Sequence, residues 1–266
     1  MSELTKRTIT ALILAPIVLY TTWISNPYPF FYLIVFIMTL CWWEIVTMKN
    51  IDTPILLAFG GWVMFTVNLY LFLTQQFHFL PFFWAISSVI TLVSLFMLVE
   101  PERGRRVFNR LLVGIIYLGF LLPFILLLKI KNPHWALLAL MLTWIFDAGS
   151  YFIGKSFGKH AFMPRISPKK SWEGFLGGLA IVIISAILIG PYLGINNLAL
   201  KLSLALIVAL LATSGDLSES FIKRAYGVKD SSSLLPGHGG FLDRIDSLCF
   251  VFLGFYMVYV FGGKFF

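Results

Sequence analysis

The sequence predicts an all-α, polytopic integral membrane protein: a helical bundle of about nine transmembrane helices, with the N-terminus inside and the C-terminus outside. Three observations support this prediction. Hydrophobic residues make up 59% of the 266 residues and charged residues only 12%, whereas a soluble domain has about 25% charged residues. Apolar runs of about 20 residues, the length that crosses a bilayer, recur along the chain. Lysine and arginine are distributed unevenly among the polar breaks. These features exclude a soluble enzyme, a secreted disulfide scaffold and a disordered chain.

The apolar runs define the predicted spans in order. They cover residues 8–25, 30–48, 54–74, 79–99, 111–128, 135–154, 173–194, 198–215 and 245–262. The first run follows Lys6 and Arg7, as the apolar segment of a signal peptide would. Because it is long and has no small-residue cleavage site, we expect a retained membrane anchor.

The basic residues predict the orientation. With the N-terminus inside, 16 of the 20 lysines and arginines fall in breaks on the cytoplasmic side and four on the other side. Since cytoplasmic loops are enriched in these residues, the split favours N-in and C-out. The net charge of +8 then serves orientation and contact with anionic lipid, and we expect no nucleic-acid partner.

We expect two regions along the chain. Residues 1–130 form N-terminal transmembrane helices of unassigned role, and residues 131–266 form a transmembrane catalytic region with cytoplasmic loops at 155–172 and 216–246. The length of the chain, without a soluble N-terminal extension, favours the bacterial inner (cytoplasmic) membrane.

The acidic residues indicate where the chemistry lies, since seven of the twelve fall between Asp147 and Asp246. Asp147 lies well inside a predicted span, where a carboxylate needs a partner, a cation or a proton. A helix that continues beyond the eighth run would place several polar side chains on one face. They are Asp216, Glu219, Ser220, Lys223 and Arg224. The alternative is a solvated turn with a Glu219–Lys223 pair, ended by Gly227.

The segment 229–246 combines a glycine-rich turn with paired carboxylates. Gly239 and Gly240 follow His238, and such glycines let the backbone approach a ligand and direct N–H groups at an anion. A plain turn is the alternative. Asp243 and Asp246 are three residues apart at the start of a helix, so they share a face. Two such carboxylates repel unless a cation lies between them, and oxygen ligands of this kind are typical of Mg²⁺.

The loop 155–172 carries five lysines and arginines but no acidic residue. Ser171 is a predicted N-cap for a helix that begins near Trp172. Lys169 and Lys170 would then lie beside a helix N-terminus, an arrangement that binds anions. Ordinary positive-inside anchoring is the alternative for these two lysines.

Acids for a divalent cation, bases for phosphates and glycines for backbone approach together indicate phosphoryl or nucleotidyl transfer. Their cytoplasmic location suggests a lipid and a soluble nucleotide as substrates. The sequence contains no GxxxxGK[ST], GxGxxG, GxSxG or HExxH motif, and its four histidines have no zinc-like spacing. Hydrolase and nucleotide-switch functions therefore have no support.

The segment from Ser220 to Asp246 resembles the signature of the phosphatidate cytidylyltransferase, or CDP-diacylglycerol synthase, family. The matching parts are SFIKR at 220–224, Lys229-Asp230 and LPGHGGFLDRID at 235–246. Gly215-Asp216, SPKK at 167–170, WEG at 172–174 and Asp147 are also similar. Ser171 stands where the family usually has threonine, which preserves the hydroxyl. The resemblance covers about residues 135–262.

The resemblance implies transfer from CTP to phosphatidate with Mg²⁺, giving CDP-diacylglycerol and pyrophosphate. The expected metal ligands are Asp147, Asp216, Asp243 and Asp246. The expected catalytic residues are Asp216, Asp243 and Asp246 of this set, together with Lys223, Arg224, Lys229, Asp230, His238 and Arg244. The expected substrate-binding residues are Lys169, Lys170, Ser171, Ser220, Gly239 and Gly240. A second cation, a homodimer and a preference for CTP over dCTP stay open.

Three other functions were weighed. A CDP-alcohol phosphotransferase would need a DGxxAR-type run, which this sequence lacks. A polyprenol or phytol kinase using CTP would leave CDP and a phosphorylated lipid. A secondary transporter also buries carboxylates in its spans, but its polar groups lie near the midplane in two related halves. Here they gather in the C-terminal half, at one predicted membrane face.

Overall fold

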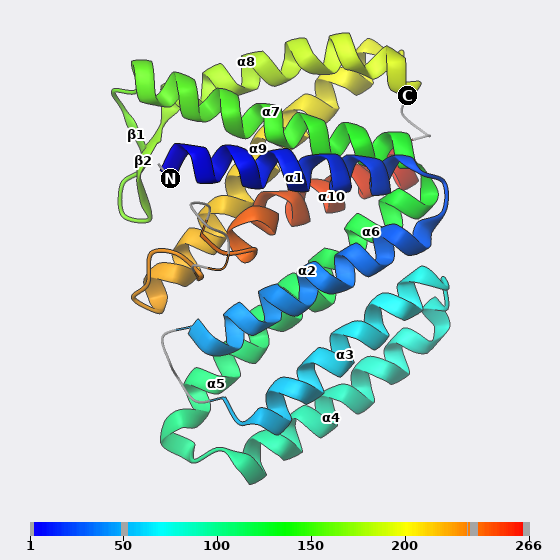
Figure 1. The fold of residues 1–266 in the computed structure, drawn as a ribbon, viewed down its shortest axis with the longest axis vertical. Coiled ribbons are helices and arrows are strands. Elements are labelled where there is room, and N and C mark those ends of the chain that lie inside the picture. Colours follow the sequence, from blue (N-terminus) through cyan, green and yellow to red (C-terminus); the bar gives the residue numbers. More distant parts are fainter. Residues whose placement is uncertain (1–2, 49–52, 233, 235–238, 263–266) are drawn as a thin grey trace. The chain divides into compact units, whose positions relative to one another are not determined.

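The computed structural model describes residues 3–48, 53–232, 234 and 239–262. It is largely helical and divides into two compact units (Figure 1). The first unit contains residues 1–130 and 226–243, and the second contains residues 131–225 and 244–266.

The first unit is built from helices, of which α5, η3 and α6 follow one another without a break. Its elements are α1 (Glu3–Trp23), α2 (Pro27–Thr47), α3 (Ile55–Leu73), the 3₁₀-helix η2 (Phe77–Phe79), α4 (Leu80–Leu98), α5 (Pro101–Gly114), the π-helix η3 (Ile115–Leu121) and α6 (Leu122–Lys131). Helices α2, α3 and α4 lie side by side (Figure 1). Trp42 of α2 joins two of them, because its indole N–H donates to the Ala58 carbonyl of α3 at 2.6 Å and its ring packs edge-on against Phe65.

Arg110 of α5 fixes the end of α2 in this unit. Its side chain is fully buried, and its guanidinium donates to the carbonyl oxygens of Val46 and Met48 and to Thr53 Oγ1 at 3.2 Å. The last carbonyls of a helix have no partner within the helix, so the planar fork of one arginine satisfies groups that would otherwise be buried unpaired. Arg110 is one of the 16 basic residues predicted on the cytoplasmic side, and its buried contacts show that it also has a structural role.

Replacing Arg110 with lysine is therefore expected to destabilise the protein by about 1–3 kcal/mol, the cost of leaving a buried carbonyl unpaired. A single ammonium cannot reproduce the two-pronged contact with Val46 and Met48. Thermal unfolding in detergent micelles measures the change. The matched control is Arg106→Lys in the same helix, because Arg106 is exposed; equal midpoints for both variants would contradict the assigned role.

The second unit contains four long helices and one hairpin. Its elements are α7 (Pro133–Phe157), β1 (Ala161–Met163), β2 (Ser167–Ser171), α8 (Trp172–Ile189), the 3₁₀-helix η4 (Gly190–Leu193), α9 (Leu198–Ala225) and α10 (Leu242–Phe261), which starts at the boundary between the units. Helices α7 and α8 pack along each other (Figure 1). Their approach is close because Gly174 and Gly178 of α8 face Ser150 of α7 with no side chain between.

The antiparallel β1–β2 hairpin connects α7 to α8. Glu173, in the first turn of α8, accepts hydrogen bonds from the backbone N–H groups of Lys159 and His160 and contacts His160 Nδ1 at 2.6 Å. Ser171 caps α8, since its hydroxyl accepts from Gly174 N at 3.1 Å. The predicted cap is thus confirmed. Glu173 holds the start of the hairpin to α8, and Ser171 holds its end.

The predicted fold class, a polytopic bundle of membrane helices, is confirmed. Within the described residues, eight helices are long and apolar enough to cross a membrane. They are Pro27–Thr47, Ile55–Leu73, Phe77–Leu98, Arg103–Lys131, Pro133–Phe157, Trp172–Leu193, Leu198–Ala225 and Leu242–Phe261. The one remaining predicted span, 8–25, corresponds to α1, whose described apolar part is the shorter Leu12–Trp23. The N-in, C-out orientation stays a prediction.

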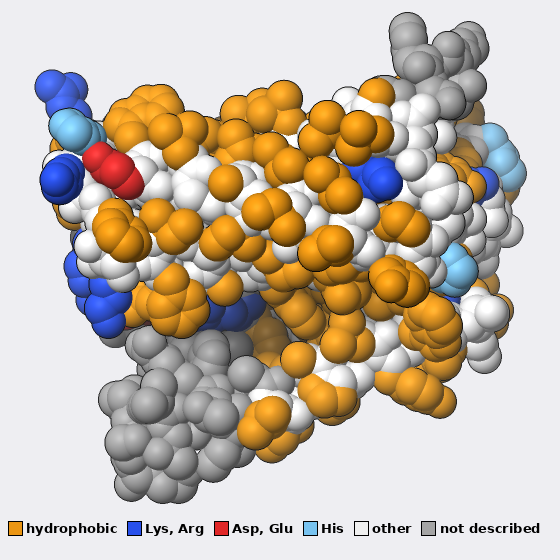
Figure 2. Space-filling model, turned by 90° about the horizontal axis from the view of Figure 1, so that it is seen from above, with side chains coloured by type: hydrophobic (Ala, Val, Ile, Leu, Met, Phe, Trp, Pro, Cys, Tyr) orange, Lys and Arg blue, Asp and Glu red, His pale blue; other side chains and the backbone are white. Residues whose placement is uncertain are grey.

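The outer surface of the helices suits a lipid environment. Large hydrophobic side chains are exposed along α4 and α8, including Phe96, Met97 and Leu188. Figure 2 shows hydrophobic side chains over much of the face that it presents, with many of the charged and histidine side chains toward its margins. In lipid such exposure is favourable, since the acyl chains are as apolar as the side chains they contact.

Candidate functional site

Three carboxylates from three candidate membrane spans gather in the second unit. They belong to Asp147 of α7, Asp216 of α9 and Asp246 of α10, and each lies close enough to the others to interact electrostatically. Asp246 is buried, with 7% exposure, whereas Asp147 is exposed and Asp216 is intermediate. Because like charges so close repel, this arrangement needs either positive charge nearby or a proton on one of the carboxyl groups.

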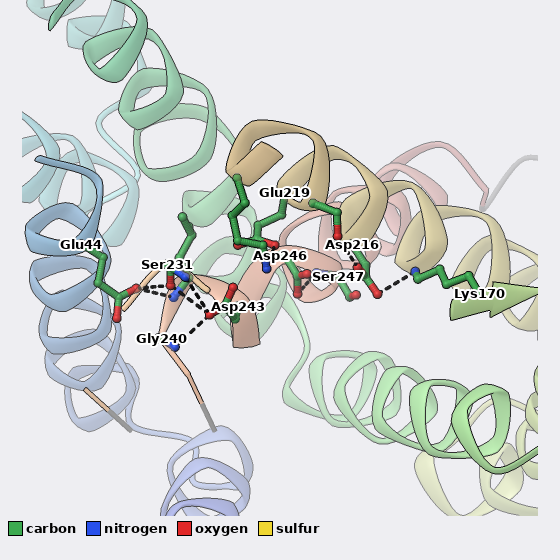
Figure 3. Close-up of polar contacts among 12 residues, drawn as sticks. Glu44, Lys170, Asp216, Glu219, Ser231, Gly240, Asp243, Asp246 and Ser247 are labelled. Atoms are coloured by element: carbon green, nitrogen blue, oxygen red, sulfur yellow. Dashed lines mark hydrogen bonds and ion pairs between the residues drawn. The ribbon is translucent and has the colours of Figure 1, made fainter. Parts of the chain in front are cut away.

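Lys170 supplies part of that charge. Its Nζ lies 2.6 Å from Asp216 Oδ2, and Ser220 Oγ donates to Asp216 Oδ1 at 3.2 Å (Figure 3). Lys170 reaches Asp216 because the hairpin returns the chain to the start of α8, where strand β2 ends. Arg244 also acts on Asp147 electrostatically, although its side chain is largely exposed. The predicted basic loop therefore contributes directly to the acidic cluster.

One turn further along α9, Glu219 and Lys223 form an ion pair of 2.5 Å. The pair that the alternative interpretation includes is therefore present, but its side chains are only 1% and 12% exposed, so this turn of the helix is not solvated. The continuation of α9 to Ala225, with polar residues on one face, agrees with the predicted helix. Gly227 follows with a φ of 68°, the left-handed conformation in which helices commonly end.

Helices α9 and α10 meet at Gly215, next to Asp216. A Cβ atom at Gly215 would lie 2.5 Å from the Asp246 carbonyl oxygen and 3.0 Å from Ser247 Cα. Ser247 Oγ donates to the Ala212 carbonyl at 3.1 Å across the same crossing. The absence of a side chain at Gly215 thus permits the backbone contact that brings Asp216 and Asp246 together.

A second polar network lies in the first unit, around Asp243. Asp243 Oδ2 accepts hydrogen bonds from Gly240 N at 2.8 Å, Ser231 Oγ at 3.0 Å and Ser231 N at 3.2 Å (Figure 3). Glu44 of α2 accepts from Ser231 and from three further donors in the same segment. Glu44 was not among the predicted site residues, although it is the only charged residue in the span 30–48.

The other predicted site residues have varied positions. Lys169, Arg224, Lys229 and Asp230 are exposed, and Gly239 has a φ of 79°. His238 lies outside the described residues, and the assignment of individual catalytic and metal-binding roles stays a prediction. Among the described residues, no three His, Cys, Asp or Glu side chains are arranged to hold a metal ion by themselves. The carboxylate oxygens of the acidic cluster are nevertheless the donor type that Mg²⁺ prefers.

These features define a multi-pass helical membrane protein with an acidic cluster that lysine and arginine side chains partly neutralise. The chain belongs to the cytidylyltransferase family, whose model matches residues 5–261.

Bacterial relatives are similar over a shorter stretch. A Thermotoga maritima protein named phosphatidate cytidylyltransferase is 41% identical over 174 residues, which cover 62% of this chain and 64% of that protein. A Staphylococcus aureus protein of the same name is 42% identical over 141 residues, covering 53% of this chain and 54% of the relative. The chain thus spans less than two thirds of the length of these relatives.

Proposed function

We propose that this protein transfers CMP from CTP to phosphatidate at the cytoplasmic face of a bacterial inner membrane. The products are CDP-diacylglycerol and pyrophosphate, in phospholipid biosynthesis. The observation that carries the proposal is the cluster of Asp147, Asp216 and Asp246 with Lys170, found in a member of the cytidylyltransferase family. The names of the Thermotoga and Staphylococcus relatives support the choice of phosphatidate as the acceptor.

The reaction joins two polyanions. An oxygen of the lipid phosphate attacks the α-phosphorus of CTP, a new P–O bond forms, and the bond to the β-phosphate breaks as pyrophosphate leaves with its electron pair. Since a phosphomonoester has a second pKa of about 6, the nucleophile is ionised near neutral pH and no general base is required. Catalysis must then come from positioning and charge neutralisation.

The residues of the cluster suit that task. Lys170, Lys223 and Arg244 would offset the negative charge of the phosphates, while carboxylates of the second unit, among Asp147, Asp216 and Asp246, would hold Mg²⁺. When bound, Mg²⁺ would neutralise phosphate oxygens and favour the departure of pyrophosphate. This ion usually takes one or two protein carboxylates and completes its shell with substrate phosphates and water. A site of that kind is compatible with the described residues, in which no three acidic side chains enclose an ion.

The proposal is tested with purified protein in lipid nanodiscs supplied with phosphatidate, CTP and Mg²⁺. We expect CDP-diacylglycerol, identified by mass spectrometry, and pyrophosphate in equal amounts, with neither formed when phosphatidate or the divalent cation is omitted. Folded protein that forms no lipid-linked CMP with any of several divalent cations would refute the proposal. Nucleotide-independent uptake into proteoliposomes would instead favour a transporter.

A further inference from the structure

Glu44 is a carboxylate buried within a membrane helix. It is the only charged residue of α2, it lies among apolar neighbours in the sequence, and its side chain has no exposed surface. An ionisable group in such a place is costly unless its partners are strong. Its partners lie nearly two hundred residues later in the sequence, within the same unit.

Four hydrogen bonds satisfy this carboxylate. Oε1 accepts from Ser232 Oγ at 2.6 Å and from Phe241 N at 2.8 Å. Oε2 accepts from Ser231 Oγ at 3.0 Å and from Leu242 N at 2.9 Å. Four donors match the full capacity of an ionised carboxylate, which accepts at about four lone-pair positions and donates nothing. The geometry therefore suits the charged form of Glu44.

Two of these donors are the backbone N–H groups of Phe241 and Leu242, at the N-terminus of α10. Such groups have no partner within the helix, and the positive end of the helix dipole attracts an anion. Phe241 also packs edge-on against Phe36 of α2, with ring centroids 6.2 Å apart. Helix α2 thus fixes the point at which α10 begins.

The remaining contacts fix the loop that precedes α10. Ser231 Oγ lies 3.0 Å from both Glu44 Oε2 and Asp243 Oδ2, so its single hydrogen is shared between two carboxylates. A Cβ atom at Gly240 would lie 2.6 Å from Glu44 Oε2. The glycine that the sequence analysis assigned to ligand approach thus also permits the approach of a carboxylate of the protein.

We propose that Glu44 is a positioning residue for nucleotidyl transfer. By holding Ser231, Ser232 and the first residues of α10, it sets the place of Asp243 and of Gly240, two residues that are expected to act in the transfer from CTP. This inference rests on the proposed function, and it gives the N-terminal helices, which had no assigned role, a part in the reaction.

The sharpest test is Glu44→Gln, because glutamine keeps the length and shape of the side chain. Its amide nitrogen would face one hydroxyl, which can rotate to accept, and one backbone N–H of Phe241 or Leu242, which cannot. We expect kcat/KM for CTP to fall by roughly 10- to 100-fold, since a displacement of about 1 Å can cost that much in rate. Hydrogen–deuterium exchange should accelerate in the peptide that contains Phe241 and Leu242.

The matched control is Ile45→Val, the next residue of α2, whose side chain is 2% exposed. It removes one methyl group from a buried side chain and leaves the Glu44 carboxylate unchanged, so we expect nearly unchanged kcat/KM and unchanged exchange at Phe241 and Leu242. Ser232→Ala removes one of the hydroxyl donors to Glu44. It should show the same effects as Glu44→Gln in weaker form, so it provides a second test if the glutamine variant does not fold.

The outcomes separate the two proposals. If the wild-type protein forms CDP-diacylglycerol and Glu44→Gln retains its kcat/KM, the positioning role is refuted while the transferase function stands. If the wild-type protein forms none, the transferase function fails, and the role of Glu44 in that reaction fails with it. If Phe241 and Leu242 exchange as slowly in Glu44→Gln as in the wild-type protein, the hydrogen bonds from their N–H groups to Glu44 are contradicted.

Discussion

Asp216→Asn is expected to reduce the transfer of CMP to phosphatidate by roughly 10²- to 10³-fold, the usual effect of removing one preorganised electrostatic group from an active site. Asparagine keeps the size of the side chain and can still accept from Ser220 Oγ. It loses the negative charge that attracts Lys170 at 2.6 Å and that would bind Mg²⁺. The half-saturating Mg²⁺ concentration should also rise.

The measurement is the rate at which label from radioactive CTP enters the lipid phase, recorded over a series of Mg²⁺ concentrations. Glu100→Gln is the matched control. Glu100 is an exposed carboxylate at the start of α5, so its substitution removes one negative charge away from the acidic cluster. A folded Asp216→Asn variant whose rate and Mg²⁺ dependence equal those of the control would remove Asp216 from the site.

Gly215→Ala is expected to have the second largest effect, both on stability and on activity. Its new methyl group would lie 2.5 Å from the Asp246 carbonyl oxygen and 3.0 Å from Ser247 Cα in α10. These are backbone atoms, which cannot relieve the clash by a change of rotamer. Forcing an extra methyl into a packed contact costs about 1–3 kcal/mol. Because the helices must move apart, the distance between the Asp216 and Asp246 carboxylates changes, and activity should fall by about 10²-fold.

Unfolding midpoints and transfer rates of the same preparations test this expectation. Gly60→Ala in α3 is the control, because a Cβ atom there would have no neighbour within 4 Å. In an open helical position alanine is favoured over glycine by about 1 kcal/mol, so the control should be as stable as the wild type or more so. Equal behaviour of the two alanine variants would show that the crossing at Gly215 is not tight.

Local features of the chain were predictable from the sequence. The apolar runs gave the membrane helices because their length matches the bilayer. Ser171 was recognisable as a helix cap, and the polar face of α9 followed from helical periodicity through Lys223. Each of these inferences depends on residues a few positions apart, where backbone geometry alone determines which side chains are neighbours.

Contacts between distant segments were not predictable in the same way. The bond between Lys170 and Asp216 depends on the hairpin that returns β2 to α8. The burial of Arg110 depends on the end of α2 lying beside α5. Glu44 could have been noticed as a lone charge in an apolar run, but its partners are set by tertiary packing, which periodicity does not encode.

The most direct test of the proposed function is to follow the two ends of the triphosphate separately. Wild-type protein would be given phosphatidate, Mg²⁺ and CTP labelled either at the α-phosphorus or at the γ-phosphorus. Cytidylyl transfer predicts that the α-label enters the lipid, as CDP-diacylglycerol, while the γ-label leaves entirely as pyrophosphate. Entry of the γ-label into lipid, with CDP left in solution, would contradict this account and establish a lipid kinase instead.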